Sequence, residues 1–427
     1  MTPQVKQRIE QIRRGEVPEG YKKTKVGIVP CEWQEIRFKN MFSRITRKNK
    51  ENNDNVLTIS AQYGLINQRD FFNKDIASDD KSNYYLLENG EFAYNKSYSN
   101  GYPFGALKRL DMYNKGIVSP LYICFAATKE NKCPDFYVHY FEAGKMNREI
   151  QAFAQEGARN HGLLNISVDD FFNSNIVAPS LPEQEKIAEI LSAQDKLIGL
   201  KEKFVEEKKR QKKVLMQQLL TGKKRLPGFS GKWKKQKMSD ILCERKEKNK
   251  AQSLRICSVA VNSGVVDQRE HLGKSIAASD TSNYNVVHYG DIVYTKSPTG
   301  AFPYGIVKQS QLAENVAVSP LYGVYEPVSY EMGYLLNEYF MYSNNTNSYL
   351  LPIVNKGAKN TINISNSTFI RPSLYLPTDF KEIERLAQIF KTANREIEIL
   401  QKELEQEKQK QKALMQLLLT GIVRVNV

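Results

Sequence analysis

The chain has 427 residues, 41% hydrophobic and 26% charged, which favours two or three globular domains with real cores and excludes a disordered chain. Lys and Arg number 62 against 47 Asp and Glu, leaving a net charge of +15. This excess of cations favours a polyanionic partner such as nucleic acid, because neutralising phosphates releases bound counterions. A basic surface that serves only solubility is the alternative interpretation.

The sequence predicts a cytoplasmic protein without a membrane partner. It has no uninterrupted apolar run near twenty residues, and its first residues, MTPQVKQRIEQIRRGE, are polar and charged. Its five cysteines form no C-x-x-C pair, which fits reduced thiols better than a disulfide framework.

Two regions rich in Tyr, Phe, Asn, Gly and Ser, roughly 15–180 and 226–378, each precede a densely charged segment. Short apolar runs punctuated by Gly, Asn and Pro predict domains dominated by short strands, with some helix. The expected strands are Val56–Ser60, Gly116–Phe125, Leu254–Val261 and Asp291–Thr295, and the expected helices lie near Phe136–Gln155 and Met332–Tyr349.

The two charged segments, Pro182–Leu220 and Lys381–Thr420, have no Pro inside them and only one Gly, Gly199. Their apolar residues recur at alternating spacings of four and three, which predicts two coiled-coil helices, each roughly 55–60 Å long. Polar residues interrupt both seams toward the middle. The predicted seam residues are Ile187, Leu191, Ile198, Val205, Leu215 and Leu219 in the first segment, and Leu386, Phe390, Ile397, Leu400, Leu404, Leu414 and Leu418 in the second.

The chain is an internal duplication. The segment from Gln68 to Lys108 aligns without a gap to the segment from Gln268 to Lys308, a shift of 200 residues. The same shift relates Trp33 to Trp233, and it becomes 199 near the ends of the halves, where Leu-Thr-Gly recurs. One register held over so long a stretch is a strong signal of a repeated unit.

Two equivalent seams in one chain can pair with each other inside the monomer. The predicted fold class is therefore α+β: two tandem α/β domains, separated by two long α-helices that form an intramolecular antiparallel coiled coil with pseudo-two-fold symmetry. The predicted boundaries are 1–181 and 223–380 for the domains, and 182–222 and 381–421 for the helices. The first domain lacks a preceding long helix, so we expect the C-terminal helix to fill that place and make the architecture circular.

Signatures of several catalytic subunits are absent from the sequence. There is no Pro-Pro pair of the kind that adenine methyltransferases use to hold a flipped base. Gly300–Gly305 has the glycine spacing of a P-loop, but Ile306 and Val307 stand where Lys and Ser or Thr are needed. The four histidines lack metal-ligand spacing to any cysteine. We therefore expect a non-catalytic chain that binds no cofactor or metal.

The chain resembles the specificity subunits of type I restriction–modification enzymes. The resemblance covers nearly the whole chain and is carried by three phrases: YNKSYSNGYPFGALKRL (Tyr94–Leu110), LPEQEKIAEIL (Leu181–Leu191) and LMQQLLTGKKRLPGF (Leu215–Phe229). The helical phrases are specific to subunits of this type as a group, whereas the domain phrase suits one subfamily of recognition domains.

The resemblance implies a DNA-binding subunit that reads a bipartite double-stranded site, one half by each domain, with the helices fixing the unread gap. It implies two modification subunits that methylate adenine N6 and two ATP-driven restriction subunits as partners. S-adenosylmethionine, ATP and Mg²⁺ are then used by those partners.

Residues shared by the two halves are expected to serve fold, phosphates or partners, and differing residues to read bases. We assign Lys96-Ser97 and Lys296-Ser297 to phosphates and the loops after them to base edges or groove shape. Ordinary inert hairpin tips are the alternative, and the basic runs Arg44–Lys50 and Arg245–Lys250 are further candidates or merely solvated faces. The candidate DNA-binding residues are Lys96, Ser97, Tyr98, Ser99, Asn100, Tyr102, Lys108, Arg159 and Asn160 in the first half, and Lys296, Ser297, Thr299, Phe302, Lys308, Lys359 and Asn360 in the second.

Two other functions stay open at this point. One is the specificity portion of a fused or split type II-like methyltransferase–nuclease with its own catalysis, against which the missing Pro-Pro pair argues. The other is a coiled-coil scaffold that does not bind DNA, which a salt-dependent gel shift would distinguish.

Overall fold

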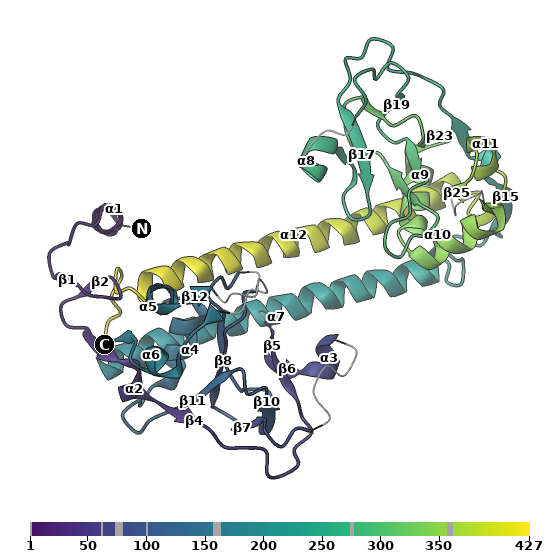
Figure 1. Ribbon diagram of the computed structural model, residues 1–427. Helices are drawn as coiled ribbons and strands as arrows, with labels where there is room; N and C mark the ends of the chain where they lie inside the picture. The colour runs from purple at the N-terminus through teal and green to yellow at the C-terminus, as the bar shows by residue number, and fades with distance from the viewer. Residues whose placement is uncertain are drawn as a thin grey trace. The chain divides into compact units, whose positions relative to one another are not determined.

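The computed structural model describes residues 2–427 except 61–62, 73–79, 100, 157–163, 274–276 and 357–361. The chain divides into two compact units, unit 1 (Met1–Lys201 with Glu403–Val427) and unit 2 (Glu202–Lys402). The division falls within both long helices, α7 (Leu181–Leu219) and α12 (Phe380–Leu418), which are drawn in Figure 1. Each unit therefore holds one globular domain and a part of each long helix.

The predicted helix bounds were 182–222 and 381–421. Each helix begins one residue earlier than predicted and ends three residues earlier than predicted. Pro182 lies in the first turn of α7, where its missing N–H costs no helical hydrogen bond. Gly222 and Gly421 follow the two helices with φ angles of 69° and 68°, a left-handed conformation that favours glycine. The repeated Leu-Thr-Gly therefore marks the end of each helix.

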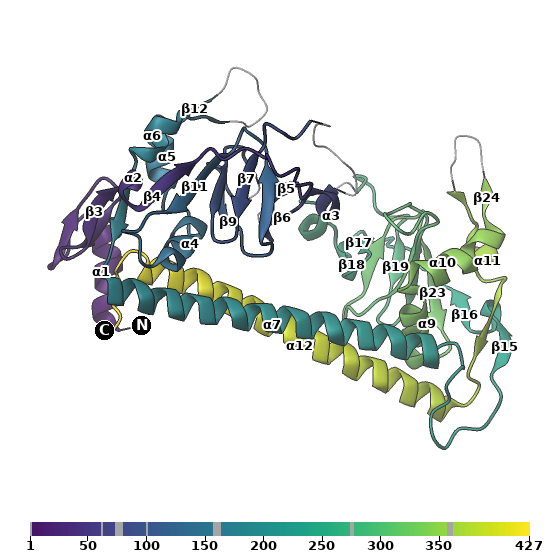
Figure 2. The same cartoon turned by 90° about the horizontal axis from the view of Figure 1, so that it is seen from below.

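The domain of unit 1 is built on an antiparallel four-stranded sheet in the order β4-β11-β8-β9. These strands span Phe42–Ile45, Ile123–Ala127, Phe92–Asn95 and Ala106–Arg109. Helix α4 (Pro134–Glu142) packs beside β9, on the side of the sheet that faces α7 (Figure 2). The other elements of unit 1 are α1 (Pro3–Arg13), β1 (Tyr21–Lys23), β2 (Ile28–Pro30), β3 (Gln34–Arg37), α2 (Phe38–Met41), β5 (Leu57–Ser60), β6 (Gly64–Asn67), α3 (Gln68–Phe72), β7 (Tyr85–Glu88), β10 (Lys115–Val118), α5 (Asn147–Phe153), β12 (Gln155–Glu156), β13 (Leu164–Asn165), α6 (Val168–Phe172) and β14 (Asn175–Ala178).

The domain of unit 2 repeats this sheet in the order β16-β23-β20-β21. These strands span Leu242–Glu244, Gly323–Pro327, Ile292–Thr295 and Ile306–Gln309. The other elements of unit 2 are β15 (Lys234–Lys237), η1 (Met238–Asp240), β17 (Ile256–Ala260), β18 (Gly264–Asp267), α8 (Gln268–Leu272), β19 (Asn285–Val287), β22 (Val316–Val318), α9 (Tyr330–Phe340), α10 (Ser343–Leu350), η2 (Leu351–Ile353), β24 (Asn355–Lys356), β25 (Ile362–Asn363), α11 (Asn366–Phe369) and β26 (Ser373–Leu376).

The duplicated sequence folds into a duplicated topology with the same register. Ile123 pairs with Tyr94 in one sheet, and Gly323 pairs with Tyr294 in the other. A second sheet in unit 2 has the order β18-β17-β22-β19, and unit 1 has the matching β5–β6 and β7–β10 pairs. The expected single run Gly116–Phe125 is two strands, because the turn at Ser119–Tyr122 separates β10 from β11.

Within each unit the two long helices run antiparallel. In unit 1, Gln194 donates to Glu407 at 2.9 Å, and Lys201 lies 3.5 Å from Glu403. In unit 2, Lys208 and Glu396 form an ion pair at 2.5 Å. The polar residues that interrupt the seam therefore contact each other across the helix pair. All predicted seam residues are buried or half-buried.

A tryptophan, a glutamate and an arginine join the helix ends to each domain. In unit 1, Trp33 Nε1 donates to Glu183 at 3.0 Å, and Arg424 pairs with the same carboxylate at 2.6 Å. In unit 2, Trp233 and Arg225 contact Glu382 at 3.2 and 2.7 Å. Arg225 precedes Trp233 in the chain, whereas Arg424 reaches Trp33 from the other terminus. The C-terminal segment thus occupies the place before the first domain, as the circular prediction required.

The core of each domain continues into its helices. In unit 1, Trp33, Phe38, Phe125 and their neighbours pack with Ile187, Leu191 and Leu418, all less than a tenth exposed. In unit 2, Tyr294, Leu336 and their neighbours pack with Leu219, Leu386 and Phe390. Burial of such large apolar side chains is the main term that holds a domain on its helices. No helix within the described residues is apolar enough over a sufficient length to cross a membrane.

Candidate nucleic-acid interface

The predicted DNA-reading loops connect the two strands of a hairpin at one edge of each four-stranded sheet, β8 to β9 and β20 to β21. Tyr94 Oη donates to the carbonyl of Phe104 at 2.7 Å, and Tyr294 donates to Tyr304 at 2.8 Å. These two tyrosines are fully buried and brace the base of each loop from inside. The tyrosine kept in both halves therefore serves the fold.

The glycine kept at Gly105 and Gly305 also has a structural cause. Both residues have positive φ angles, 79° and 101°. A β-carbon at either position would collide with the backbone carbonyl that ends the preceding strand. Only glycine fits this close approach, so the return of the loop into β9 or β21 has the same path in both domains.

Lys96 and Lys296 leave the ends of β8 and β20 as half-buried side chains. Burial lowers the pKa of both ammonium groups. The following serines are held by hydrogen bonds from their own N–H groups, Ser97 to Asn95 and Ser297 to Thr295, each at 3.1 Å. An anion that approaches such a partly desolvated lysine stabilises its charged form. Each of these two positions therefore favours the binding of an anion.

The tips of the loops have one backbone pattern and different side chains. Ser99 and Tyr102 exchange backbone hydrogen bonds at 3.3 and 2.8 Å, and Thr299 and Phe302 do so at 3.1 and 2.9 Å. Tyr98 is 62% exposed, and Ser297, Thr299 and Gly300 are also exposed. The same scaffold therefore presents different groups in the two domains, which is what readers of different sequences require.

Two of the predicted DNA-contacting side chains are buried in this structure. Phe302 is 6% exposed and packs in a core cluster with Val259, Val287 and Ile306. Lys308 is 3% exposed, its Nζ lies 2.8 Å from Met341 Sδ, and burial lowers its pKa to about 8. Neither side chain reaches the surface, so neither can contact a duplex without rearrangement.

Lys108 and Tyr102 are turned toward the helices rather than toward the loop tip. Lys108 forms an ion pair with Glu142 of α4, and its ammonium lies 4.8 Å from the centre of the Tyr102 ring. The Tyr102 hydroxyl donates to the same carboxylate. Lys108 was interpreted as a phosphate contact, and the structure pairs it within its own domain, with Glu142 of α4.

Five further candidates, Asn100, Arg159, Asn160, Lys359 and Asn360, lie outside the described residues. The strands that flank the second pair of candidate loops are described, however. The N–H of Leu164, at the start of β13, donates to the carbonyl of Lys96 at 3.0 Å. In unit 1, β13 therefore begins beside the end of β8, where Lys96 lies.

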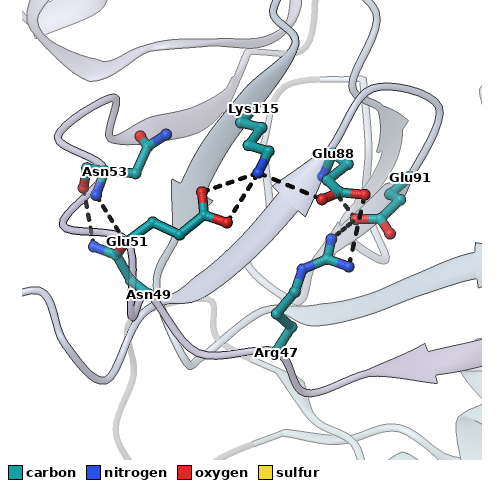
Figure 3. A network of polar contacts seen from close by, with 7 residues as sticks. All are labelled: Arg47, Asn49, Glu51, Asn53, Glu88, Glu91 and Lys115. Carbon is teal, nitrogen blue, oxygen red and sulfur yellow. Dashed lines mark hydrogen bonds and ion pairs between the residues drawn. The ribbon is translucent and has the colours of Figure 1, made fainter.

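The basic run Arg44–Lys50 is partly neutralised within its own domain (Figure 3). Arg47 contacts Glu91 at 2.6 Å and Glu88 at 3.8 Å, and Lys115 contacts Glu51 at 2.9 Å. This local network favours a structural role for Arg47 over a contact with DNA.

The corresponding pair in unit 2 has its acidic residue at the other of the two positions, a feature that sequence reasoning missed. Glu247 stands where Arg47 stands, His288 stands where Glu88 stands, and their side chains are 2.8 Å apart. The neighbouring Arg245 forms an ion pair with Asp291 at 2.7 Å, and Asp291 is 1% exposed. Comparing residues at the shift of 200 would have revealed this paired exchange.

The described residues hold no group of three or more His, Cys, Asp or Glu side chains arranged to bind a metal ion. His139 is buried on α4, which lowers its pKa to about 4, and it contacts Ser192 at 3.0 Å. Cys124 is buried and its thiol pKa is raised to about 12, so neither group is poised as an acid, base or nucleophile near pH 7.

No protein-family model and no curated protein matches the chain, but solved structures do. A chain from a structure of complex assembly and conformational transition in the type I restriction–modification system matches at TM-score 0.52, with 13% identity, covering 92% of this chain and 99% of that one. The S subunit of a type I restriction–modification system from M. genitalium matches at TM-score 0.53, with 13% identity, covering 92% and 96%. The chain therefore has the fold of the S subunits of type I restriction–modification systems.

Proposed function

We propose that this chain is the specificity subunit of a type I restriction–modification enzyme: a non-catalytic, sequence-specific DNA-binding protein that recognises a bipartite site in cytoplasmic double-stranded DNA. The observation that carries the proposal is the duplicated hairpin loop, which has one backbone path and two different sets of exposed side chains. The likeness in fold to S subunits supports the same conclusion.

The partners that follow from this proposal are two modification subunits, which methylate adenine N6, and two restriction subunits. S-adenosylmethionine, ATP and Mg²⁺ belong to those partners. The part of this chain in the enzyme is to place a reading loop in each half-site and to carry the catalytic subunits.

The test is the pattern of methylated adenine in host DNA with and without this gene, read by single-molecule sequencing. We expect one bipartite motif to disappear when the gene is deleted and to return when it is restored. The purified chain incubated with DNA, S-adenosylmethionine and Mg²⁺ should give no product until modification subunits are added. An unchanged methylation pattern, or methylation by the chain alone, would contradict the proposal.

A further inference from the structure

The contact between each recognition domain and its helices is built around the lysine that both halves share. Lys108 and Lys308 lie on equivalent strands, β9 and β21, next to the helix of the domain that faces α7 and α12. We call the polar contacts around Lys108 the first junction and those around Lys308 the second junction. The other polar residues of the two junctions differ.

In the first junction the long helices present a carboxylate, a hydroxyl and an amide to the domain. Ser192 and Asp195 of α7 lie 3.0 and 3.5 Å from the two ring nitrogens of His139. Gln411 of α12 donates to Asp195. Because burial lowers the pKa of His139 to about 4, its ring is neutral at pH 7 and acts as a hydrogen-bonding group. The first junction borders a cavity of about 540 Å³.

In the second junction the long helices present cations instead. Lys212 of α7 forms an ion pair with Glu338 of α9 at 2.7 Å, and their side chains are only 11% and 2% exposed. Asn394 of α12 donates to the other oxygen of Glu338 at 2.9 Å. Lys391 of α12 lies 3.8 Å from Glu331 of α9. Here the domain supplies carboxylates and the helices supply ammonium groups.

The residues that differ occupy equivalent positions. At the shift of 199, Ser192 corresponds to Lys391, Asp195 to Asn394 and Gln411 to Lys212. At the shift of 200, Val138 of the first domain corresponds to Glu338 of the second. Both sides of the contact have therefore changed together, while the apolar packing around them is shared.

The exchanged residues make the two domains incompatible with each other's helices. On the first helix segment, Glu338 would face Asp195 and Gln411 instead of the lysine that pairs with it in the second junction. On the second segment, Lys212 would face Val138, and the nearby carboxylate of the first domain, Glu142, already pairs with Lys108. A buried charge without its partner is strongly destabilising, whereas a matched pair is close to neutral.

We propose that the two junctions are matched locks: each accepts only its own recognition domain, so that neither domain can dock on the other's part of the helix pair. Ser192, Asp195 and Gln411 define the first lock, and Lys391, Asn394 and Lys212 define the second. The loops then determine what is read, and the locks determine which domain reads from which position.

The test is a full-length chain in which residues 34–178 are replaced by residues 234–376, so that the second domain occupies both positions. Its unit 1 should unfold on the order of 10 °C below the parent in a thermal scan. Adding the helix substitutions Ser192→Lys, Asp195→Asn and Gln411→Lys should recover most of that decrease. Hydrogen–deuterium exchange of peptides from 181–201 identifies which transition belongs to unit 1.

The matched control places the same change of charge on exposed helix positions, by Glu185→Asn, Gln409→Lys and Ala413→Lys, and should recover nothing. In the parent chain, where unit 1 keeps its own domain, the same three helix substitutions should have the opposite effect. They should lower the temperature at which unit 1 unfolds. Equal midpoints with and without the lock substitutions would overturn the proposal. If neither exchanged chain folds, the parent carrying the three substitutions decides, since an unchanged or raised midpoint there also contradicts it.

Discussion

At the scale of single residues, the recurrence of a residue in both halves did not show whether it serves DNA binding or the fold. Tyr94, Gly105 and Lys108 recur in the second half, and all three brace the loop or join the domain to the helices. Lys308 is buried because β21 packs against α9, and no local pattern in the sequence reveals which strand faces a helix. The half-buried Lys96 and Lys296 are the shared cations that stay candidates for phosphate.

Replacing Lys96 and Lys296 with Ala tests that assignment. We expect affinity to fall by a similar factor for cognate and unrelated DNA, and the slope of log affinity against log salt to become shallower by about 0.9 for each phosphate that the variant no longer neutralises. Lys203→Ala and Lys402→Ala are the controls, because both are exposed lysines at equivalent positions of the long helices. Titrations at several salt concentrations that give the parent slope would remove Lys96 and Lys296 from the interface.

Asp195 predicts a pH dependence that the sequence did not suggest. Desolvation, followed by the nearby charge of Glu142, raises the pKa of this carboxyl to about 6. The folded state therefore holds a proton that the unfolded chain releases near pH 4, so the contribution of Asp195 to stability falls as the pH rises from about 4 to 6. The buried His139, with its pKa lowered to about 4, has the opposite sign over this range.

The Asp195→Asn variant removes the first of these contributions. Its free energy of unfolding relative to the parent should increase as the pH rises from 4 to 7. Asn394, which occupies the equivalent place in unit 2, already has this neutral amide. Chemical denaturation at four or five pH values measures the difference, and a difference that does not vary with pH would contradict the assignment.

At the scale of elements, most of the fold was predictable because it depends on local signals. The heptad pattern and Leu-Thr-Gly located both long helices to within three residues. The run Gly116–Phe125 was interpreted as one strand, because the Ser119–Tyr122 turn contains apolar residues and no glycine. The antiparallel contacts within each unit followed from the duplication, whereas the charge exchange at the junctions depends on side-chain contacts that no spacing encodes.

The structure also defines which part of the reading loop can be exchanged. Tyr102 contacts Glu142 and Phe302 is buried, so both belong to the domain rather than to the loop tip. We therefore predict that replacing residues 98–101 with the sequence of 298–301 alters recognition of one half-site and leaves folding intact. Sequencing of methylated adenines reports the motif. The reciprocal exchange should alter the other half-site, and two unchanged motifs would mean that these tips do not read DNA.

At the scale of the whole molecule, both long helices contribute residues to both units, so their length is shared between the two domains. Inserting four residues after Glu207 of α7, with four after Glu396 of α12, adds about 6 Å of helix and about one turn. Lys208 and Glu396, which pair at 2.5 Å, then keep their register. We expect the methylated motif to keep both half-sites and to widen its unread gap by one or two base pairs, since base pairs rise about 3.4 Å each.

The same insertion in α7 alone should disrupt methylation, because it breaks the register of the helix pair. If the paired insertion leaves the gap unchanged, the helices do not measure it, and the separation of the half-sites must be set by the partner subunits.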